Sequence, residues 1–316
     1  MKLGFTIIEL LVSLAVFSLA IPIIYQVSEG VIFSTATANI VNDLKLINQK
    51  LIEDIKSDVV QSAVIFDDTS SYKNKISLNL PSNYIALNNN KKLPVINETG
   101  SFPPNPTDVG NILFMARYLS PIEVTVDSTD YRIDCYRFLY YFLAKDTSTT
   151  INGRNPIVLL KAQSRETYVD YVAINNVPDN NIKKALVQAL YNMGIRYAVD
   201  LKNIKFYSLN TNGNISPDNN HQVQMDTSLA SKDSGVNTLP TGKVYYAIGY
   251  NNMGYIAIPK FASPDNTGDG FPHGFEVAIV GPRSSRDILV RTVVIAYFSG
   301  KVLGNENSTI ISVPQF

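Results

Sequence analysis

The chain has 316 residues, a length that fits one large domain or two ordinary ones. It carries 27 Lys and Arg against 27 Asp and Glu, and 45% of its residues are hydrophobic, which excludes a polybasic nucleic-acid binder and an acidic disordered chain. The single cysteine, Cys135, excludes an internal disulfide and a zinc site built from cysteines, and two histidines leave little for histidine-based catalysis.

The most apolar segment comes first, at residues 5–24 (FTIIELLVSLAVFSLAIPII), where thirteen of twenty residues are Phe, Ile, Leu or Val. A helix of this length covers about 30 Å, the thickness of a bilayer core. The apolar side chains favour membrane insertion by about 4–8 kcal/mol, which outweighs a cost of about 3 kcal/mol for Glu9. The sequence therefore predicts a membrane-spanning helix that contains a carboxylate.

Three interpretations of this segment compete. A secretory signal peptide would be cleaved after the small residues of Ser18-Leu19-Ala20, although Lys2 is the only cation before the apolar run. A plain membrane anchor leaves the cost of Glu9 unexplained. In the third interpretation Glu9 is functional, because an ionisable group within a membrane usually has a partner.

Residues 2–9 (KLGFTIIE) decide between these interpretations by a resemblance. Together with the apolar run that follows, they resemble the class III leader of type IV pilins and type II secretion pseudopilins. The resemblance implies that residues 1–4 are a leader, that a prepilin peptidase cuts after Gly4, and that Phe5 becomes the N-methylated first residue. It also implies that Glu9, then the fifth residue, pairs with the amine of Phe5 in a neighbouring subunit.

The residue types suit these roles. Gly4 has no side chain to obstruct a protease at the membrane face and permits an extended scissile backbone. Cleavage exposes a cationic amine at Phe5, and its attraction to Glu9 is far stronger in a low-dielectric helix bundle than in water. The pairing would set the register of a subunit that joins a filament.

Apolar residues continue along residues 25–65 at spacings of four and three, which predicts an amphipathic continuation of the same helix. They are Ile40, Leu44, Ile47, Leu51, Ile55 and Val59. Such a helix would be buried on all sides at first and would then pack one stripe on its own head.

Weaker helix-forming residues separate the two halves. Pro22 removes a backbone donor and Gly30 costs roughly 1 kcal/mol relative to Ala. These residues predict a kink or a locally unwound stretch within 22–35, with a mild bend as the alternative.

Residues 66–316 change to short alternating runs separated by Asn, Gly, Pro and Ser, which predicts a globular head rich in β-strands. Only residues 182–193 show helical spacing, with Gly194 as the stop. The polar tracts 88–110 and 210–242 are expected to be surface loops. The fold class is α+β, a long helix that carries a mainly antiparallel sheet. The expected strands are 76–80, 84–87, 111–118, 122–126, 131–143, 156–162, 168–174, 204–209, 243–249, 254–259, 274–281 and 287–299.

Residues 265–276 nearly match the spacing of a calcium-binding loop. Side-chain oxygens would come from Asp265, Thr267 and Asp269, a carbonyl from Phe271, and a bidentate carboxylate from Glu276. Thr at the third place and flanking strands in place of helices depart from the pattern, so a polar turn is the alternative. Some pseudopilin heads bind calcium in loops, and we expect no other cofactor.

The remaining candidates favour structural roles. The motifs of serine hydrolases, phosphate-binding loops and zinc metalloproteases are absent, so we expect no enzyme. Cys135 and the aromatic residues 136–142 are expected in the core of the sheet. Arg283, Arg286 and Arg291 could form a local basic patch, although the balanced charge argues against unaided nucleic-acid binding.

The resemblance extends to the function. A head near 250 residues is bulky for a repeating subunit and resembles the large minor pilins and the J-type minor pseudopilins, which prime assembly at or near the tip. The implied partners are other pilin or pseudopilin subunits, the prepilin peptidase and an inner-membrane assembly platform. The implied location is first a single pass through the cell membrane with the head outside the cytoplasm, then an extracellular pilus or a periplasmic pseudopilus. The alternatives are a pilus-tip adhesin, a DNA-uptake subunit or a major pilin.

Overall fold

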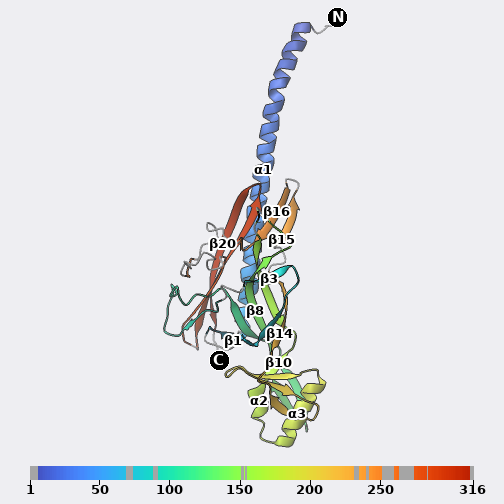
Figure 1. Ribbon diagram of the computed structural model, residues 1–316, viewed down its shortest axis with the longest axis vertical. Helices are drawn as coiled ribbons and strands as arrows, with labels where there is room; N and C mark the ends of the chain where they lie inside the picture. Colours follow the sequence, from blue (N-terminus) through green and yellow to red (C-terminus); the bar gives the residue numbers. More distant parts are fainter. Residues whose placement is uncertain are drawn as a thin grey trace.

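The computed structural model describes residues 6–68, 74–87, 92–150, 153, 155–230, 235–239, 242–250, 260–262, 274–282 and 284–313. One long helix, α1 (Ile7–Val60), projects from an elongated head of β-sheets, and a small α/β unit lies at the end of the head far from the N-terminus (Figure 1). The fold is α+β as predicted, with strands forming most of the head.

Helix α1 begins at the N-cap Thr6 and ends at the C-cap Gln61. The apolar spacing, which ends at Val59, predicted a helix to about residue 60, and α1 ends at Val60. The predicted segment 25–65 also took in strand β1 (Ser62–Phe66), which starts two residues after the helix ends. This stretch, with Val64, Ile65 and Phe66, favours an extended strand, and it pairs with β5 (Leu113–Tyr118). Pairing with the sheet therefore removes residues 62–65 from the predicted helical segment.

The larger sheet has twelve strands, with β8 (Cys135–Asp146) and β9 (Pro156–Ser164) at its centre. Its path runs β13-β12-β11-β10-β8-β9-β14-β2, while β5 and β3 also pair with β8, β1 pairs with β5, and β17 pairs with β9. The other strands are β2 (Ile76–Asn79), β3 (Tyr84–Ala86), β10 (Tyr168–Asp170), β11 (Tyr197–Asp200), β12 (Lys205–Leu209), β13 (Ile215–Pro217), β14 (Val223–Leu229) and β17 (Gly249–Tyr250).

The second sheet has six strands along the path β15-β16-β19-β18-β4, with β20 on the other side of β19. A separate hairpin joins β6 (Ile122–Val126) to β7 (Thr129–Ile133). Most pairings are antiparallel, and the parallel ones among the described strands are β10–β11, β14–β2 and β18–β4. The strands of the second sheet are β4 (Ile96–Asn97), β15 (Gly235–Leu239), β16 (Gly242–Ala247), β18 (Phe275–Val280), β19 (Arg286–Phe298) and β20 (Lys301–Val313).

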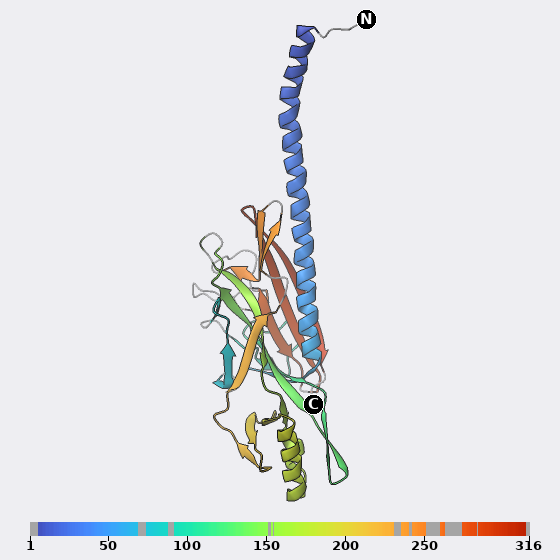
Figure 2. The same ribbon diagram turned by 90° about the vertical axis from the view of Figure 1, so that its right-hand side faces the viewer.

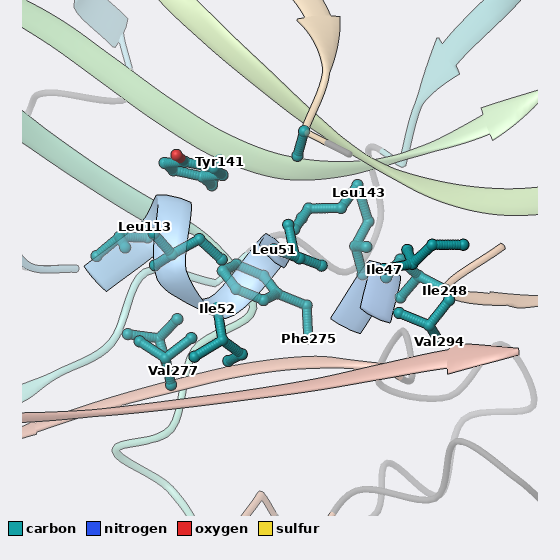
Figure 3. Packing of buried hydrophobic residues seen from close by; sticks show 14 of the residues in the cluster. Ile47, Leu51, Ile52, Leu113, Tyr141, Leu143, Ile248, Phe275, Val277 and Val294 are labelled. Atoms are coloured by element: carbon teal, nitrogen blue, oxygen red, sulfur yellow. The ribbon is translucent and has the colours of Figure 1, made fainter. Parts of the chain in front are cut away.

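The second half of α1 lies between the two sheets, and Figure 3 shows this packing directly. Leu51 contacts a single core to which the first sheet contributes Tyr141 and Leu143 and the second sheet contributes Phe275 and Val294. Because sheets cover the helix from two directions, the buried stripe is wider than the one the sequence pattern gave. It comprises Ala36, Ile40, Leu44, Ile47, Asn48, Leu51, Ile52, Ile55, Asp58 and Val59.

The distal unit is built on the parallel pair β10 and β11, which α2 (Tyr171–Asn175) and α3 (Asn180–Asn192) connect. Asp179 caps α3, and Gly194, at a φ of 93°, follows its end as predicted. The unit has its own hydrophobic core, separate from that around α1, which includes Cys135 and Leu186. It forms a compact tip on the elongated head (Figure 2).

Several elements differ from the predicted ones. The expected strand 168–174 ends at residue 170, because Asp170 caps α2. The expected loops 88–110 and 210–242 contain short strands, among them β4 and β14. Strand β20 was not predicted, since its Gly, Asn and Ser residues have low β-propensity, yet it pairs with β19 along thirteen positions. The expected strand 254–259 lies outside the described residues.

Candidate functional site

The candidate site is the first part of α1, residues 7–35, called here the exposed half. Its side chains are exposed apart from the half-buried Ala20, and the first buried residue of the helix is Ala36. At 1.5 Å per residue the exposed half is about 44 Å long. By length and composition α1 could therefore cross a membrane. The head leaves the apolar side chains of this half exposed, although Phe33 near its end stacks on Phe298.

Glu9 lies in the first turn of this half. Its Oε2 accepts hydrogen bonds from the backbone N–H and the hydroxyl of Thr6, each at 2.9 Å, and the Thr6 hydroxyl accepts from the Glu9 N–H at 3.3 Å. This reciprocal arrangement is a capping box. A carboxylate in the first turn also interacts favourably with the positive end of the helix dipole. Oε1 makes no hydrogen bond to the described residues. Gly4 and Phe5 lie outside the described residues.

Two hydroxyl groups of the exposed half, those of Ser13 and Ser18, are bonded within the helix. The Ser13 hydroxyl donates to the Glu9 carbonyl at 2.7 Å, and the Ser18 hydroxyl donates to the Ala15 carbonyl at 2.8 Å. A hydroxyl bonded to its own helix can enter an apolar environment at little cost. Ser18, Leu19 and Ala20, the alternative cleavage site, lie within the unbroken helix.

The helix continues through Pro22 and Gly30 without interruption. The predicted unwound stretch is absent from the single chain, and the alternative of a mild bend fits the gentle curvature of α1 (Figure 2). Pro22 removes one backbone donor, and the flanking turns of a 54-residue helix keep their own hydrogen bonds. One lost bond is not enough to break a helix of this length.

Residues 36–60, called here the clamped half, are fixed in the head by polar groups that the sequence pattern did not identify. Asn48 is fully buried, and its Nδ2 donates to the Asn305 carbonyl at 2.9 Å and to Asn305 Oδ1 at 3.0 Å. Its Oδ1 accepts a hydrogen bond from the Thr292 hydroxyl. These bonds fix the register of α1 against β19 and β20, since a shifted helix would leave a buried amide unpaired.

Asp58 anchors the last turn of the helix to the first sheet. Its Oδ1 accepts from Arg117 at 3.1 Å, and its Oδ2 accepts from the Tyr141 hydroxyl at 2.5 Å and from Lys161. The carboxylate side chain is 4% exposed, whereas the two cations are 31% and 24% exposed. A nearly buried charge thus has three donors, which opposes movement of the helix relative to the sheet.

The predicted calcium ligand Glu276 has other partners. It is fully buried, and its carboxylate accepts hydrogen bonds from Arg291 and from the backbone N–H groups of Lys260, Phe261 and Ala262. These donors occupy both oxygens, so the predicted bidentate role of Glu276 does not fit the structure. Asp265, Thr267, Asp269 and Phe271 lie outside the described residues.

The suggested basic patch is not formed by its described members. Arg291 is buried between Glu276 and Glu306, and Arg286 is buried with Glu98 3.5 Å away. Arg283 lies outside the described residues. The buried arginines are therefore not available to phosphate groups, which removes the local support for a DNA-uptake subunit.

The predicted core residues are confirmed. Cys135 is buried, and burial raises the pKa of its thiol to about 11, which keeps it protonated and unreactive. Phe138 and Tyr140 belong to an aromatic cluster, in which the Phe114 ring lies 5.8 Å from each of them. This stretch forms the interior of the sheet.

Comparison with known proteins identified no relative of this chain. No protein-family model, no curated protein and no solved structure matches the chain. The assignment to a family accordingly remains a prediction that residues 2–9 and the two halves of α1 carry.

Proposed function

We propose that the chain is a structural subunit of a type IV pilus or a type II secretion pseudopilus, processed after Gly4 and assembled through the exposed half of α1. One observation carries the proposal: a single continuous helix changes at about Ala36 from a largely exposed half to a half buried between two sheets. The clamped half fixes the orientation of the exposed half, which leaves a rigid apolar rod for contacts outside the head.

The apolar side chains of this rod require a cover. Each fully buried Leu or Ile side chain gains about 1.5–3 kcal/mol relative to water, so the rod belongs in lipid before assembly and among other subunits' helices afterwards. Lipid and the helices of other subunits both cover the same apolar side chains, which allows a subunit to move from the membrane into a filament.

Glu9 distinguishes this role from that of a plain anchor. Both donors of Thr6 bond Oε2 of Glu9, so Oε1 remains open to a donor from another molecule. The amine that cleavage creates on Phe5 of a neighbouring subunit is the donor that we propose. Opposite charges attract strongly in a medium of low dielectric constant, so the ion pair favours one axial register.

The shape of the head favours a minor subunit at or near the tip. The distal unit built on β10 and β11 extends the head away from the exposed half (Figures 1 and 2). A bulky head is less suited to a closely repeating shaft than to the end of a filament, where one side has no neighbour. The partners would be sister subunits, the prepilin peptidase and an inner-membrane platform.

The intact mass of the protein isolated from cell membranes tests the processing step. We expect a loss of Met1–Gly4 and the gain of one methyl group. A mature chain that begins at Ile21 would establish a secretory signal, and an uncut chain would establish a plain anchor. Either result contradicts the proposal.

Substitution of Glu9 tests the assembly step. Glu9→Val should leave the protein in the membrane fraction, because it makes the helix more apolar, but should abolish crosslinking to sister subunits and incorporation into fibres. Glu29→Val is the matched control, since Glu29 lies on the same helix beyond the apolar run and carries no predicted role. Undiminished incorporation of Glu9→Val would show that the carboxylate is dispensable.

A further inference from the structure

A groove of about 1350 Å³ lies where the base of the main head meets the distal α/β unit. Its walls come from segments far apart in the sequence: the end of α1 with β1, the end of β5, the junction of β7 with β8, and the ends of β10 and β11. Junctions between structural units are frequent places for binding sites. The volume is sufficient for several residues of an extended chain.

Two carboxylates, those of Asp134 and Asp170, lie side by side in the lining of this groove. The backbone N–H of Asp170 donates to the carbonyl of Asp134 at 2.9 Å, one step beyond the paired residues Val169 and Cys135 of β10 and β8. Opposite residues of antiparallel strands point to the same face, so the two carboxylates are cross-strand neighbours. Like charges directly opposite each other destabilise a sheet when no cation separates them.

The carboxylates have few partners of their own. Asp170 Oδ1 accepts the N–H of Val172 at 2.9 Å as the cap of α2, and Asp134 Oδ1 accepts the Tyr118 hydroxyl at 3.4 Å. Neither forms an ion pair with a described residue, although Arg132 and Lys202 also line the groove. Burial, and then the nearby charges of Asp134 and Asp200, raise the pKa of Asp170. With three aspartates against one Arg and one Lys in its lining, the groove has an excess of one negative charge.

The rest of the lining is mainly aromatic and apolar, with the polar residues Gln61 and Ser62 among it. The rings of Tyr118 and Tyr136 meet edge to face, with centroids 6.2 Å apart. The apolar part comprises Val60, Ala63, Val64, Val172 and Leu201. Aromatic faces attract ammonium and guanidinium groups, and an apolar wall accepts the methylene stems of Lys and Arg. A single metal ion would use neither the apolar surface nor the volume.

We propose that this groove binds an extended basic segment of a partner protein, with a Lys or Arg side chain between Asp134 and Asp170. Charge complementarity identifies the occupant: the cation would separate two like-charged carboxylates and would lie beside the tyrosine rings. All of these residues belong to the head, so the proposal does not depend on how the helix assembles.

Fluorescence anisotropy with the full chain in detergent micelles tests the proposal. The probe is the fluorescein-labelled peptide Val-Lys-Val-Lys-Val, and the control peptide has Glu in place of each Lys. Asp134→Asn and Asp170→Asn should each weaken binding about fivefold, the effect of one partly exposed charge pair. Asn still caps α2 at position 170, so both variants should melt at or above the temperature of the parent chain.

Asp226→Asn is the matched control, because Asp226 is an exposed aspartate that pairs with Arg165 outside the groove. It should bind the lysine peptide as the parent chain does. The proposal is overturned by an absence of saturable binding, by equal binding of the glutamate peptide, or by unchanged affinity in both groove variants. Binding of CaCl₂ alone, without binding of the peptide, would also overturn it by assigning the groove to a metal ion.

Discussion

The division of α1 into two halves predicts opposite outcomes for the same substitution. Leu51 in the clamped half is 1% exposed, between Tyr141 and Leu143 of one sheet and Phe275 of the other (Figure 3). Leu19 in the exposed half is 71% exposed. We therefore expect Leu51→Ala to destabilise the head and Leu19→Ala to leave its stability unchanged.

The magnitude follows from the packing around Leu51. The cavity beside this side chain has a volume of only about 10 Å³, so removal of the isobutyl group opens new space in a filled core. Leu→Ala changes at such sites cost about 3–5 kcal/mol in the free energy of unfolding. For a protein of this size, a loss of 3 kcal/mol lowers the melting temperature by roughly 6–12 °C.

Near-UV circular dichroism of the full chain in detergent can measure this difference, because the chain has 18 tyrosines and no tryptophan. Leu51→Ala should melt well below the parent chain, and Leu19→Ala should melt with it. Equal melting temperatures for Leu51→Ala and the parent would refute the placement of the helix between the sheets. An equal decrease in both variants would refute the division of the helix at Ala36.

Three further predictions test two ion-pair sites and the burial of Cys135. Asp58→Asn should lower the free energy of unfolding in urea by about 2 kcal/mol, because Arg117 and Lys161 lose their counter-charge, a cost reduced by their partial exposure; an unchanged midpoint would contradict the anchoring role. A hydrogen bond from Arg291 lowers the pKa of Glu306 to about 2 from an unfolded value of 4.5, so this group stabilises the fold above pH 4.5 and the stabilisation is lost as the pH falls toward 2. Glu306→Gln should flatten that part of the pH–stability curve, and parallel curves for variant and parent would count against the ion pair. Cys135 should react with iodoacetamide at pH 8 only after unfolding in urea, since its thiol is buried and its pKa is about 11; rapid labelling of the folded chain would show that the thiol is accessible.

Much of the secondary structure follows from local pattern. The alternation and β-branched residues of 122–126 and 287–299 predicted strands that the structure has nearly unchanged as β6 and β19. The polar strand β20 was missed, because its residues favour strand formation only in contact with β19 on one side and α1 beneath it. Residues 171–174 were predicted as strand because of their β-propensity, but the cap at Asp170 starts helix α2 there.

The sequence by itself determined the two-part character of α1. An unbroken apolar run, followed by Ile40, Leu44 and Leu51 at helical spacing, is a property of neighbouring residues, which a single helix expresses without reference to the rest of the chain. The motif around Glu9 is equally local, and its capping box with Thr6 forms within one turn.

The tertiary structure alone decided which polar residues meet. Asp58 and Lys161 are 103 positions apart, and Asp134 and Asp170 become neighbours only because β10 pairs with β8. A local pattern carries no information about which distant strands pair, since strand order depends on how two sheets close around one helix. The clamp on α1 and the acidic groove are therefore consequences of topology.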